Sequence, residues 1–357
     1  MPASSNPTST VPALRVGVIG AGANTRQFHI PRLQAIEGVE IVGVCNRSTA
    51  SGKAVADKFG IPKVCESWRE VLEDPAIDAV VIGTWPDSHA VLACAALEHG
   101  KHVLCEARMA RDIEEARRML RTSQAFPELV AQLVPAPFTF KYDRTIQDLI
   151  AGGYLGDILS IELRVSTPTF IDRTGPMRWR SDFALTGYNT MTMGIWYETL
   201  MRWVGEASRV TAMSKVFVKQ RPDPSTGQLM AIRVPDHMDI LADMACGAQA
   251  NMRFSAVTGL AGSTSSAWIY GSEGTLHLDK AADGLYGGRR GDTALAEIAV
   301  APEKAAEWRV ELDFVDSIRR KAPVRLTSFL DGVRYMEFTE AVARSARSGE
   351  TIALPLA

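Results

Sequence analysis

From Leu14 onward, short apolar runs alternate along the chain with amphipathic stretches of helical length. This alternation is typical of β-α-β units that build a parallel sheet, and strands that are apolar on both faces are expected where helices cover both sides of that sheet. The pattern predicts strands at 14–19, 39–45, 79–84, 102–106 and 129–133, with helices at about 24–37, 48–59, 88–99 and 112–123. We therefore expect residues 13–135 to form a doubly wound α/β domain.

The pattern changes after Pro135 and Pro137. A helix is predicted near 142–151, longer alternating strands follow at 158–167, 209–219, 238–244, 248–254, 266–271 and 275–278, and two helices end the chain at about 305–321 and 328–348. These elements predict that residues 136–357 form an α+β domain with an open, mostly antiparallel sheet covered by helices on one face. Because the other face of such a sheet is a common oligomer surface, we expect a homodimer or homotetramer.

Composition narrows the classes of partner. Lys plus Arg number 39 against 41 for Asp plus Glu, and there is no basic run, so no nucleic-acid partner is expected. The apolar stretches fall short of the ~20 residues that a membrane helix needs, so no membrane partner is expected either. Residues 1–12 are rich in Pro, Ser and Thr and lack the features of a signal peptide, which predicts a disordered tail on a cytoplasmic protein. The five cysteines are widely spaced, which favours reduced thiols, and no Cys/His spacing indicates a metal site.

A glycine turn stands where the first predicted strand passes into the first predicted helix, with the sequence Gly20-Ala-Gly22-Ala23-Asn24-Thr25. Gly20 permits the tight turn, and Gly22 lets the backbone approach a pyrophosphate held by the helix N-terminus. Thr25 replaces the usual third glycine, at which the helix normally packs close to the strand. In this strand-to-helix context the motif predicts a dinucleotide site that includes Ala23 and Asn24.

The residues that follow the second strand bear on which dinucleotide binds. An Asp or Glu is expected there for the ribose of NAD, whereas this chain has Asn46, Arg47 and Ser48. The guanidinium and the hydroxyl can instead hydrogen-bond a 2′-phosphate. We therefore predict NADP as the preferred cofactor, with NAD as the alternative.

Several further segments follow the pattern of one protein family. They are 78–84 with His89, 95–106, the pair Trp179-Arg180, the stretch 194–205 and Gly-Ser-Glu-Gly-Thr at 271–275. With them the chain resembles the Gfo/Idh/MocA family, the group of glucose-fructose oxidoreductase and inositol dehydrogenase, from about Leu14 to the C-terminus. The resemblance implies a nicotinamide-binding Rossmann domain followed by a substrate domain. It also implies cofactor contacts from Thr84, Trp85, His89, Glu106, Trp179 and Arg180.

The resemblance breaks down at the positions that the family uses for proton transfer. Members usually carry Glu-Lys-Pro after the fifth strand, where this chain has Glu-Ala-Arg at 106–108. The family's substrate-domain helix carries Asp-x-Gly-x-His-x-x-Asp, and its glycine aligns with Gly194. Its Asp, His and second Asp then align with Thr192, Trp196 and Thr199. By this alignment the usual lysine, aspartates and histidine are all absent.

Other side chains are candidates to take over this role. Oxidation of a secondary alcohol must remove the hydroxyl proton, and a positioned acid or base contributes about 10² to 10⁴ in rate. Tyr188, just before the expected pocket helix, and Tyr197 on that helix are candidates, because a nearby cation favours the charged form of a tyrosine. Arg108 stays protonated, and it could stabilise an alkoxide or bind a carboxylate or phosphate of the substrate. Glu198 is expected to pair with Arg202 at i+4.

The sequence leaves three functions open. The first is an NAD(P)-dependent oxidoreductase that acts on a sugar, polyol or related hydroxy or keto compound with an atypical proton-transfer group. The second is an enzyme of the same fold that uses the cofactor for elimination or epimerisation, or a reductase whose substrate takes its proton from water. The third is a non-catalytic NADP-binding sensor. We expect the first, with a carbohydrate-like small molecule as the partner, and steady-state turnover separates the third from the other two.

Overall fold

Six parallel strands form the N-terminal sheet, in the order β3-β2-β1-β4-β5-β6. The computed structural model describes residues 13–261 and 264–357, so the tail predicted at 1–12 lies outside the described residues. The strands are β1 (Leu14–Ile19), β2 (Val39–Cys45), β3 (Lys63–Cys65), β4 (Ala79–Ile82), β5 (His102–Cys105) and β6 (Ala131–Leu133). This order is that of a Rossmann fold, with its switch point between β1 and β4. The predicted doubly wound sheet is confirmed.

Helices connect these strands and cover both faces of the sheet. They are the π-helical turn η1 (Thr25–His29), α1 (Ile30–Gln34), α2 (Thr49–Phe59), α3 (Trp68–Glu73), α4 (Pro86–Glu98) and α5 (Ile113–Ala125). Local chemistry sets several of the ends. Ser48 accepts a hydrogen bond from the Ser51 amide at the start of α2, and Gly60 ends that helix in the left-handed conformation. The helix predicted at 24–37 corresponds to η1 and α1. It begins with a π-helical turn and ends at Gln34, earlier than predicted.

Nine strands form the second sheet, in the order β16-β15-β14-β13-β7-β12-β11-β8-β17. All neighbours are antiparallel except β7 and β12, which confirms the mostly antiparallel prediction. The strands are β7 (Ile158–Ser166), β8 (Ala207–Lys215), β11 (His237–Met244), β12 (Gln249–Ser255), β13 (Thr264–Gly271), β14 (Gly274–Asp279), β15 (Gly284–Arg289), β16 (Ala296–Glu297) and β17 (Ile352–Ala353). A separate hairpin consists of β9 (Gln220–Pro222) and β10 (Leu229–Ala231).

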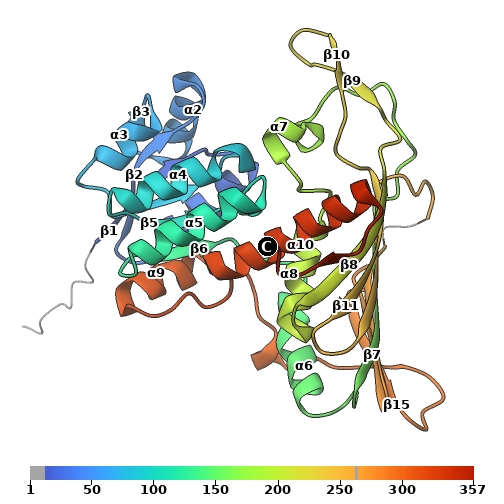
Figure 1. Cartoon of the computed structure of the whole chain (residues 1–357). Helices are drawn as coiled ribbons and strands as arrows, with labels where there is room; N and C mark the ends of the chain where they lie inside the picture. Colours follow the sequence, from blue (N-terminus) through green and yellow to red (C-terminus); the bar gives the residue numbers. More distant parts are fainter. Residues whose placement is uncertain (1–12, 262–263) are drawn as a thin grey trace, which may run out of the picture.

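Helices lie on the face of this sheet that is turned toward the Rossmann domain, and Figure 1 shows α6, α8 and α10 between the two. The helical elements of the C-terminal half of the chain are α6 (Phe140–Ala151), η2 (Trp179–Ser181), α7 (Phe183–Thr186), α8 (Met193–Val204), η3 (Pro302–Lys304), α9 (Val310–Arg320) and α10 (Phe329–Ser348). Side chains on the covered face are buried, such as Ile240 and Ala242, whereas Leu241 on the opposite face is half exposed. The described residues therefore leave one face of the sheet without a helix.

The helix α9 returns to the Rossmann domain, although the sequence places it in the C-terminal half of the chain. Val310, Phe314 and Val315 are buried in the same hydrophobic cluster as β1 and β2. The side-chain amide of Gln132, on β6, donates to the carbonyl oxygen of Val310 over 3.1 Å. The N-terminal sheet is thus completed by residues far beyond position 135.

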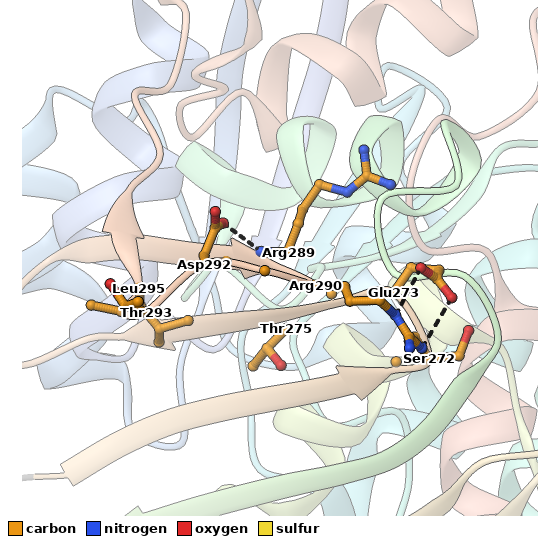
Figure 2. A pocket seen from close by; sticks show the side chains of 13 residues that line it. Ser272, Glu273, Thr275, Arg289, Arg290, Asp292, Thr293 and Leu295 are labelled. Carbon is orange, nitrogen blue, oxygen red and sulfur yellow. Dashed lines mark hydrogen bonds and ion pairs between the residues drawn. The ribbon is translucent and has the colours of Figure 1, made fainter.

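A surface hollow of about 470 Å³ lies among the turns that join β13, β14 and β15. It includes the segment 271–275 that the sequence analysis singled out. Figure 2 shows Arg290 lying against Ser272 and Glu273, and the Arg290 Nε–Glu273 Oε2 distance is 3.2 Å. Figure 1 places these turns at the end of the sheet away from the Rossmann domain. The hollow is therefore separate from the predicted dinucleotide site.

Candidate functional site

The glycine turn crosses the end of β1 in the conformation that the motif predicts. Gly20 has φ +86°, and a Cβ there would lie 2.5 Å from Thr84 Cγ2 and 2.8 Å from the Thr84 amide nitrogen. Gly22 and Ala23 are exposed at the start of the helix that follows. A backbone without side chains at the N-terminus of a helix suits the pyrophosphate of a dinucleotide. The turn therefore fits the predicted cofactor.

Thr25 shows how the chain accommodates the missing third glycine. Its side chain is only 1% exposed, and its hydroxyl donates to the carbonyl oxygen of Gly20 over 3.3 Å. It packs against Gly83, where a Cβ would lie 2.1 Å from Thr25 Oγ1. A glycine at the end of β4 thus makes the room that the usual third glycine would supply. The Thr25 side chain is enclosed by the turn, and the predicted contact of this residue with the cofactor stays a prediction.

Residues after β2 support the turn from the other side. The amide of Ala21 donates to Asn46 Oδ1 over 2.7 Å, so the Asn46 side chain holds the glycine turn against β2. Arg47 is exposed, with its guanidinium carbon 5.6 Å from the centre of the Trp85 ring. The Ser48 hydroxyl is engaged as the cap of α2. Of this group, Arg47 is the side chain with a free charged end.

A buried polar network lies behind the turn and joins three distant parts of the chain. His29 on η1 is fully buried and donates to Glu106 Oε1 over 2.9 Å and to Glu311 Oε1 over 2.6 Å. Asn24 also donates to Glu106, and the Trp308 indole donates to Glu311 over 2.8 Å. The network fixes Glu106, at the end of β5, relative to the glycine turn. Sequence reasoning missed His29, although a histidine on the buried side of this helix is a recognisable signal.

The charges of this network are coupled. Burial alone would lower the pKa of His29, but hydrogen bonds to Glu106 and Glu311 outweigh burial and raise the pKa to about 9. Burial would raise the pKa of Glu106, but the hydrogen bonds from His29 and Asn24 and the positive charge of His29 together outweigh burial and lower the pKa. At neutral pH the imidazolium therefore lies between two carboxylates.

His89 occupies a structural position instead of a cofactor contact. It is 0% exposed, and its two ring nitrogens face the carbonyl oxygens of Arg108, at 3.0 Å, and Thr84, at 3.1 Å. Burial lowers the pKa of His89, which favours the neutral ring. The predicted cofactor contact is wrong for this side chain, which ties the end of β4 to the segment after β5. Thr84, half-buried at that end, lies beside the glycine turn, and its predicted contact with a cofactor stays a prediction.

Two tryptophans connect the domains in front of these strand ends. Trp85, which precedes α4, stacks on Trp179 of η2 with ring centres 5.9 Å apart and an interplanar angle of 13°. The guanidinium of Arg180 lies 4.2 Å from the centre of the Trp179 ring. Trp179 and Arg180 are thereby brought from the C-terminal half of the chain to the edge of the Rossmann sheet. Their contact with a cofactor stays a prediction.

Arg108 lies where the segment after β5 meets the start of α8. It is 5% exposed, and its Nε is a buried donor without a hydrogen-bond partner among the described residues. The absent side chain of Gly194 leaves it room, because a Cβ at 194 would lie 3.4 Å from Arg108 Cδ. Burial, and then the charge of Arg180, lower the pKa of Arg108 to about 10, which still leaves it protonated at neutral pH.

Tyr188 and Asn189 enter the same region from the loop before α8. The amide of Tyr188 donates to the carbonyl oxygen of Arg111 over 2.9 Å, and the half-buried ring packs edge-on against Phe183 at 5.4 Å. Asn189 is 1% exposed and donates from Nδ2 to the carbonyl oxygen of Ala110 over 2.7 Å. This segment is therefore held directly against residues 108–111.

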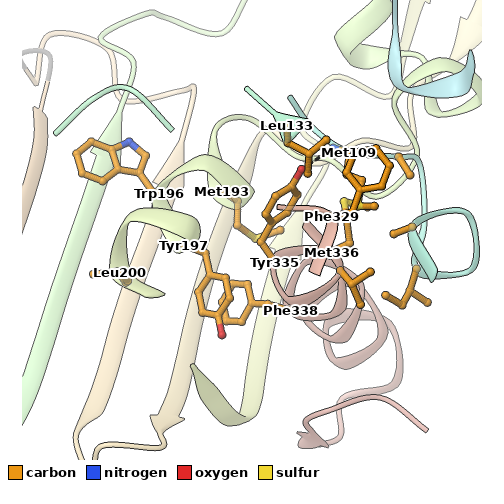
Figure 3. Packing of buried hydrophobic residues seen from close by; sticks show 14 of the residues in the cluster. Met109, Leu133, Met193, Trp196, Tyr197, Leu200, Phe329, Tyr335, Met336 and Phe338 are labelled. Carbon is orange, nitrogen blue, oxygen red and sulfur yellow. Dashed lines mark hydrogen bonds between the residues drawn. The ribbon is translucent and has the colours of Figure 1, made fainter. Parts of the chain in front are cut away.

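Tyr197 belongs to the hydrophobic core, so its predicted catalytic role is wrong. Figure 3 shows its ring flat against Phe338, with ring centres 3.6 Å apart, and it is 1% exposed. Its hydroxyl accepts a hydrogen bond from the amide of Ala207 over 2.8 Å. Burial raises the pKa of Tyr197 far above its ordinary value, which suppresses the phenolate. The helical spacing of α8 turns this residue toward α10 and away from the strand ends.

Trp196 and Glu198 also have their side chains in the interior. Trp196 is 1% exposed and packs against Phe138 with ring centres 5.7 Å apart. Glu198 pairs with Arg202 over 3.2 Å, as predicted, and accepts from the Thr327 hydroxyl over 2.7 Å. Neither side chain reaches the site as an acid or base.

Within residues 13–261 and 264–357, no three His, Cys, Asp or Glu side chains are placed to hold a metal ion. The helices of the same residues include none that is both long and apolar enough to cross a membrane.

Two sequence profiles of one family match the chain. The first, described as an oxidoreductase family with an NAD-binding Rossmann fold, matches residues 14–130, and the second, the GFO/IDH/MocA C-terminal domain, matches residues 144–277. The chain belongs to the Gfo/Idh/MocA oxidoreductase family. The resemblance on which the sequence analysis relied is thereby confirmed for both halves of this Gfo/Idh/MocA protein.

Individual relatives match parts of the chain. The uncharacterized oxidoreductase ORF334 of Rhizobium meliloti is 32% identical over 203 residues, which cover 56% of this chain and 59% of that protein. Levoglucosan dehydrogenase of Pseudarthrobacter phenanthrenivorans is 28% identical over 231 residues, which cover 60% of this chain and 57% of that protein. The chain thus matches less than two thirds of the length of these two curated relatives.

Solved structures extend the likeness of fold to nearly the whole chain. A levoglucosan dehydrogenase without ligand superimposes with a TM-score of 0.83 at 22% identity, covering 97% of this chain and 100% of that one. The same enzyme in complex with NADH and L-sorbose gives a TM-score of 0.82. At this identity the likeness concerns the fold.

Proposed function

We propose that this Gfo/Idh/MocA protein is an NAD(P)-dependent oxidoreductase that acts on a hydroxyl or carbonyl group of a sugar, polyol or related compound. The observation that carries the proposal is the meeting of two domains at the ends of β1, β4 and β5. There the glycine turn packs against Thr84, Trp85 stacks on Trp179, and Arg108 lies against Gly194 at the start of α8. The name of the related levoglucosan dehydrogenase supports a carbohydrate-like substrate.

The cofactor would be held mainly by the Rossmann domain. Gly20, Gly22, Ala23 and Asn24 would surround the pyrophosphate at the N-terminus of the helix, because the two glycines have no side chain and Gly22 and Ala23 are exposed there. When bound, the nicotinamide ring accepts or supplies a hydride. We propose NADP as the preferred form, because the exposed guanidinium of Arg47 follows β2 at the place where an acid would select NAD.

The proton of the reacting hydroxyl needs a separate path. The chain has Ala107, Thr192 and Trp196 at the positions that align with the family's usual lysine, aspartate and histidine. We propose that Tyr188 transfers the proton and that Arg108 stabilises the developing alkoxide through its charge. The support is that the Tyr188 amide donates to the carbonyl oxygen of Arg111, three residues after Arg108.

Substitution Tyr188→Phe tests this assignment. We expect kcat to fall by about 10² to 10⁴, with little change in the dissociation constant of NADPH, because only the proton-transfer group is removed. Tyr197→Phe is the matched control, since its ring lies in the core. Its kcat per folded molecule should match the parent protein. An unchanged kcat for Tyr188→Phe would contradict the proposed role.

The oxidoreductase itself is tested with protein and NADP at near-equal concentrations, so that a single slow turnover is visible. A panel of sugars, polyols and glycosides is added while the near-ultraviolet absorbance of reduced nicotinamide is followed. A rise with one compound establishes hydride transfer and its substrate class. Absence of any rise, with NADP binding shown in the same sample, would contradict net redox chemistry on these compounds.

One observation favours a second function. No ordinary acid or base occupies the three aligned positions, and Trp196 at one of them lies in the core. A protein that binds NADP without net oxidation, either as a sensor or for elimination or epimerisation, needs no such group for alcohol oxidation. Conversion of a substrate without a change in absorbance would select the elimination or epimerisation reading.

We also propose that the chain assembles as a homodimer or homotetramer through the sheet face that no described helix covers. Met213 and Leu241 are 73% and 50% exposed on that face. Trp268 and His277 stack there with ring centres 3.7 Å apart. Exposed apolar and aromatic side chains on a sheet face that no described helix covers favour association. The cytoplasmic location expected from the scattered cysteines stays a prediction.

A further inference from the structure

The strongest unexplained feature near the strand ends is a buried cation without a counter-ion. Arg108 is 5% exposed, and its side chain forms neither a hydrogen bond nor an ion pair with any described residue. Burying a charge costs several kcal/mol unless a partner compensates it. A guanidinium kept in this position therefore calls for an anion that the chain itself does not supply.

A second arginine adds to the same excess of positive charge. Arg180, on η2, is close enough for its charge to lower the pKa of Arg108, so two like charges approach one another. Arg180 lies over the Trp179 ring and has no carboxylate partner among the described residues. The two arginines come from different domains, and neither has a carboxylate partner among the described residues.

An acid close to Arg108 in the chain is already occupied. Glu106, two residues before Arg108, accepts from His29 and from Asn24, and its other oxygen accepts from the amide of Ala107 over 3.2 Å. The missing counter-ion must therefore come from outside the chain, either from the cofactor or from the substrate. The pyrophosphate is expected at Gly20 and Gly22, whereas Arg108 lies against Gly194 of α8. This position favours the substrate.

We propose that Arg108 and Arg180 bind an anionic group of the substrate, so that this protein selects an acidic sugar or polyol, with a carboxylate or phosphate, over its neutral counterpart. The inference rests on the proposed function and defines its substrate class. An arginine fork pairs with either anion through two parallel hydrogen bonds, which makes the contact both strong and directional.

The test measures equilibrium binding by calorimetry, with and without saturating NADPH. D-glucuronate and D-glucose 6-phosphate are the acidic probes, and D-glucose is the neutral one. We expect at least one acid to bind tenfold or more tightly than glucose, and the identity of that acid distinguishes a carboxylate from a phosphate. Equal dissociation constants for the three compounds, or no binding of either acid, would overturn the inference.

Variants locate the effect. Arg108→Met and Arg180→Gln should each lower the affinity for the acid about tenfold or more, so that the preference for the acid over glucose shrinks, whereas Arg108→Lys should keep part of that preference. Arg180 is exposed, so its variant remains informative if Arg108→Met fails to fold. Arg173→Gln removes a charge from the same loop at an exposed residue and should change nothing. Loss of affinity for NADPH instead of the acid would overturn the inference by assigning Arg108 to the cofactor.

These outcomes are separable from failure of the proposed function. A protein that binds neither NADPH nor NADH is no nicotinamide-dependent oxidoreductase, yet acid binding to the free protein still supports the arginine site. Conversely, reduction of NADP with a neutral sugar, without binding of either acid, would support the proposed function and contradict the acidic substrate class.

Discussion

At Thr25 a side chain stands where this type of turn usually has a glycine, and the chain compensates across the sheet. The hydroxyl and Cβ of Thr25 fill the space beside Gly83, so the tight packing between the first helix and the end of β4 is kept. The glycine motif is therefore distributed over two segments that are far apart in sequence. A search for the motif within residues 20–25 finds Gly20 and Gly22 but misses Gly83.

Substitution Gly83→Ala is expected to lower the free energy of unfolding by about 1–3 kcal/mol, because the added methyl group would overlap its neighbours. Its carbon would lie 2.1 Å from Thr25 Oγ1 and 2.4 Å from the Gly20 carbonyl oxygen. Urea denaturation measures the loss. Gly43→Ala in β2 is the control, since the nearest atom there, Cys65 Sγ, is 3.7 Å away and no loss is expected. Equal stability of the two variants would contradict the packing argument.

His29 is expected to make stability depend on pH above neutrality. Its pKa is raised from 6.5 to about 9 on folding, so its contribution is fully present below pH 6.5 and is lost as the pH rises through about 9. The size of this contribution is ~3 kcal/mol, at about 1.4 kcal/mol per pKa unit. Glu106 has a lowered pKa, so its own contribution is present above pH 4.5 and is lost in acid.

Urea denaturation of the parent protein and of His29→Gln at pH 6, 7.5 and 9 checks this dependence. The difference in unfolding free energy between the two should shrink as the pH rises. A difference that stays constant over this range would show that His29 is neutral in the folded protein.

At the scale of elements, long periodic segments were predictable and short ones were not. The strands β1 and β2 and the helix α10 follow from runs of apolar residues or from helical spacing. The three-residue strand β3 and the short helix α3 were missed, because neither is long enough to show a period.

The candidate site divides in the same way. The glycine turn follows from local sequence, since each residue acts through its own backbone. The burial of Thr25, His89 and Tyr197 does not, because it depends on partners that are distant in the chain, such as Phe338 for Tyr197. Spacing on α8 places Tyr197 near the expected pocket but does not reveal which side of the helix meets α10.

The helix α9 yields a prediction at this scale. Phe314 is 0% exposed in the cluster that includes β1 and β2, so Phe314→Ala should lower the free energy of unfolding by about 3–5 kcal/mol. Denaturation followed by circular dichroism measures the change. Arg320→Ala, at an exposed position on the same helix, should stay within about 0.5 kcal/mol of the parent protein. A small effect of Phe314→Ala would show that α9 is only loosely attached to the sheet.

For the whole molecule, the helix-free sheet face predicts an oligomer. Light scattering after size exclusion should give two or four times the chain mass of 38.8 kDa. Leu241→Lys, in the middle of that face, should shift the mass toward that of one chain, because a charge would be buried in the contact. Leu330→Lys on α10 is the matched control and should leave the mass unchanged. A parent protein of one chain mass would refute the proposed assembly.

The return of α9 to the first sheet limits how this protein can be recombined with its relatives. A chimaera joined at a single point near residue 135 would combine a foreign α9 with this chain's β1 and β2, and Glu311 would be replaced together with it. The partner of His29 would then depend on which parent supplied the C-terminal half. A functional exchange of substrate domains therefore requires three crossover points, near residues 135, 302 and 325, so that residues 302–325 stay with the nucleotide-binding half while α10 and β17 stay with the second sheet.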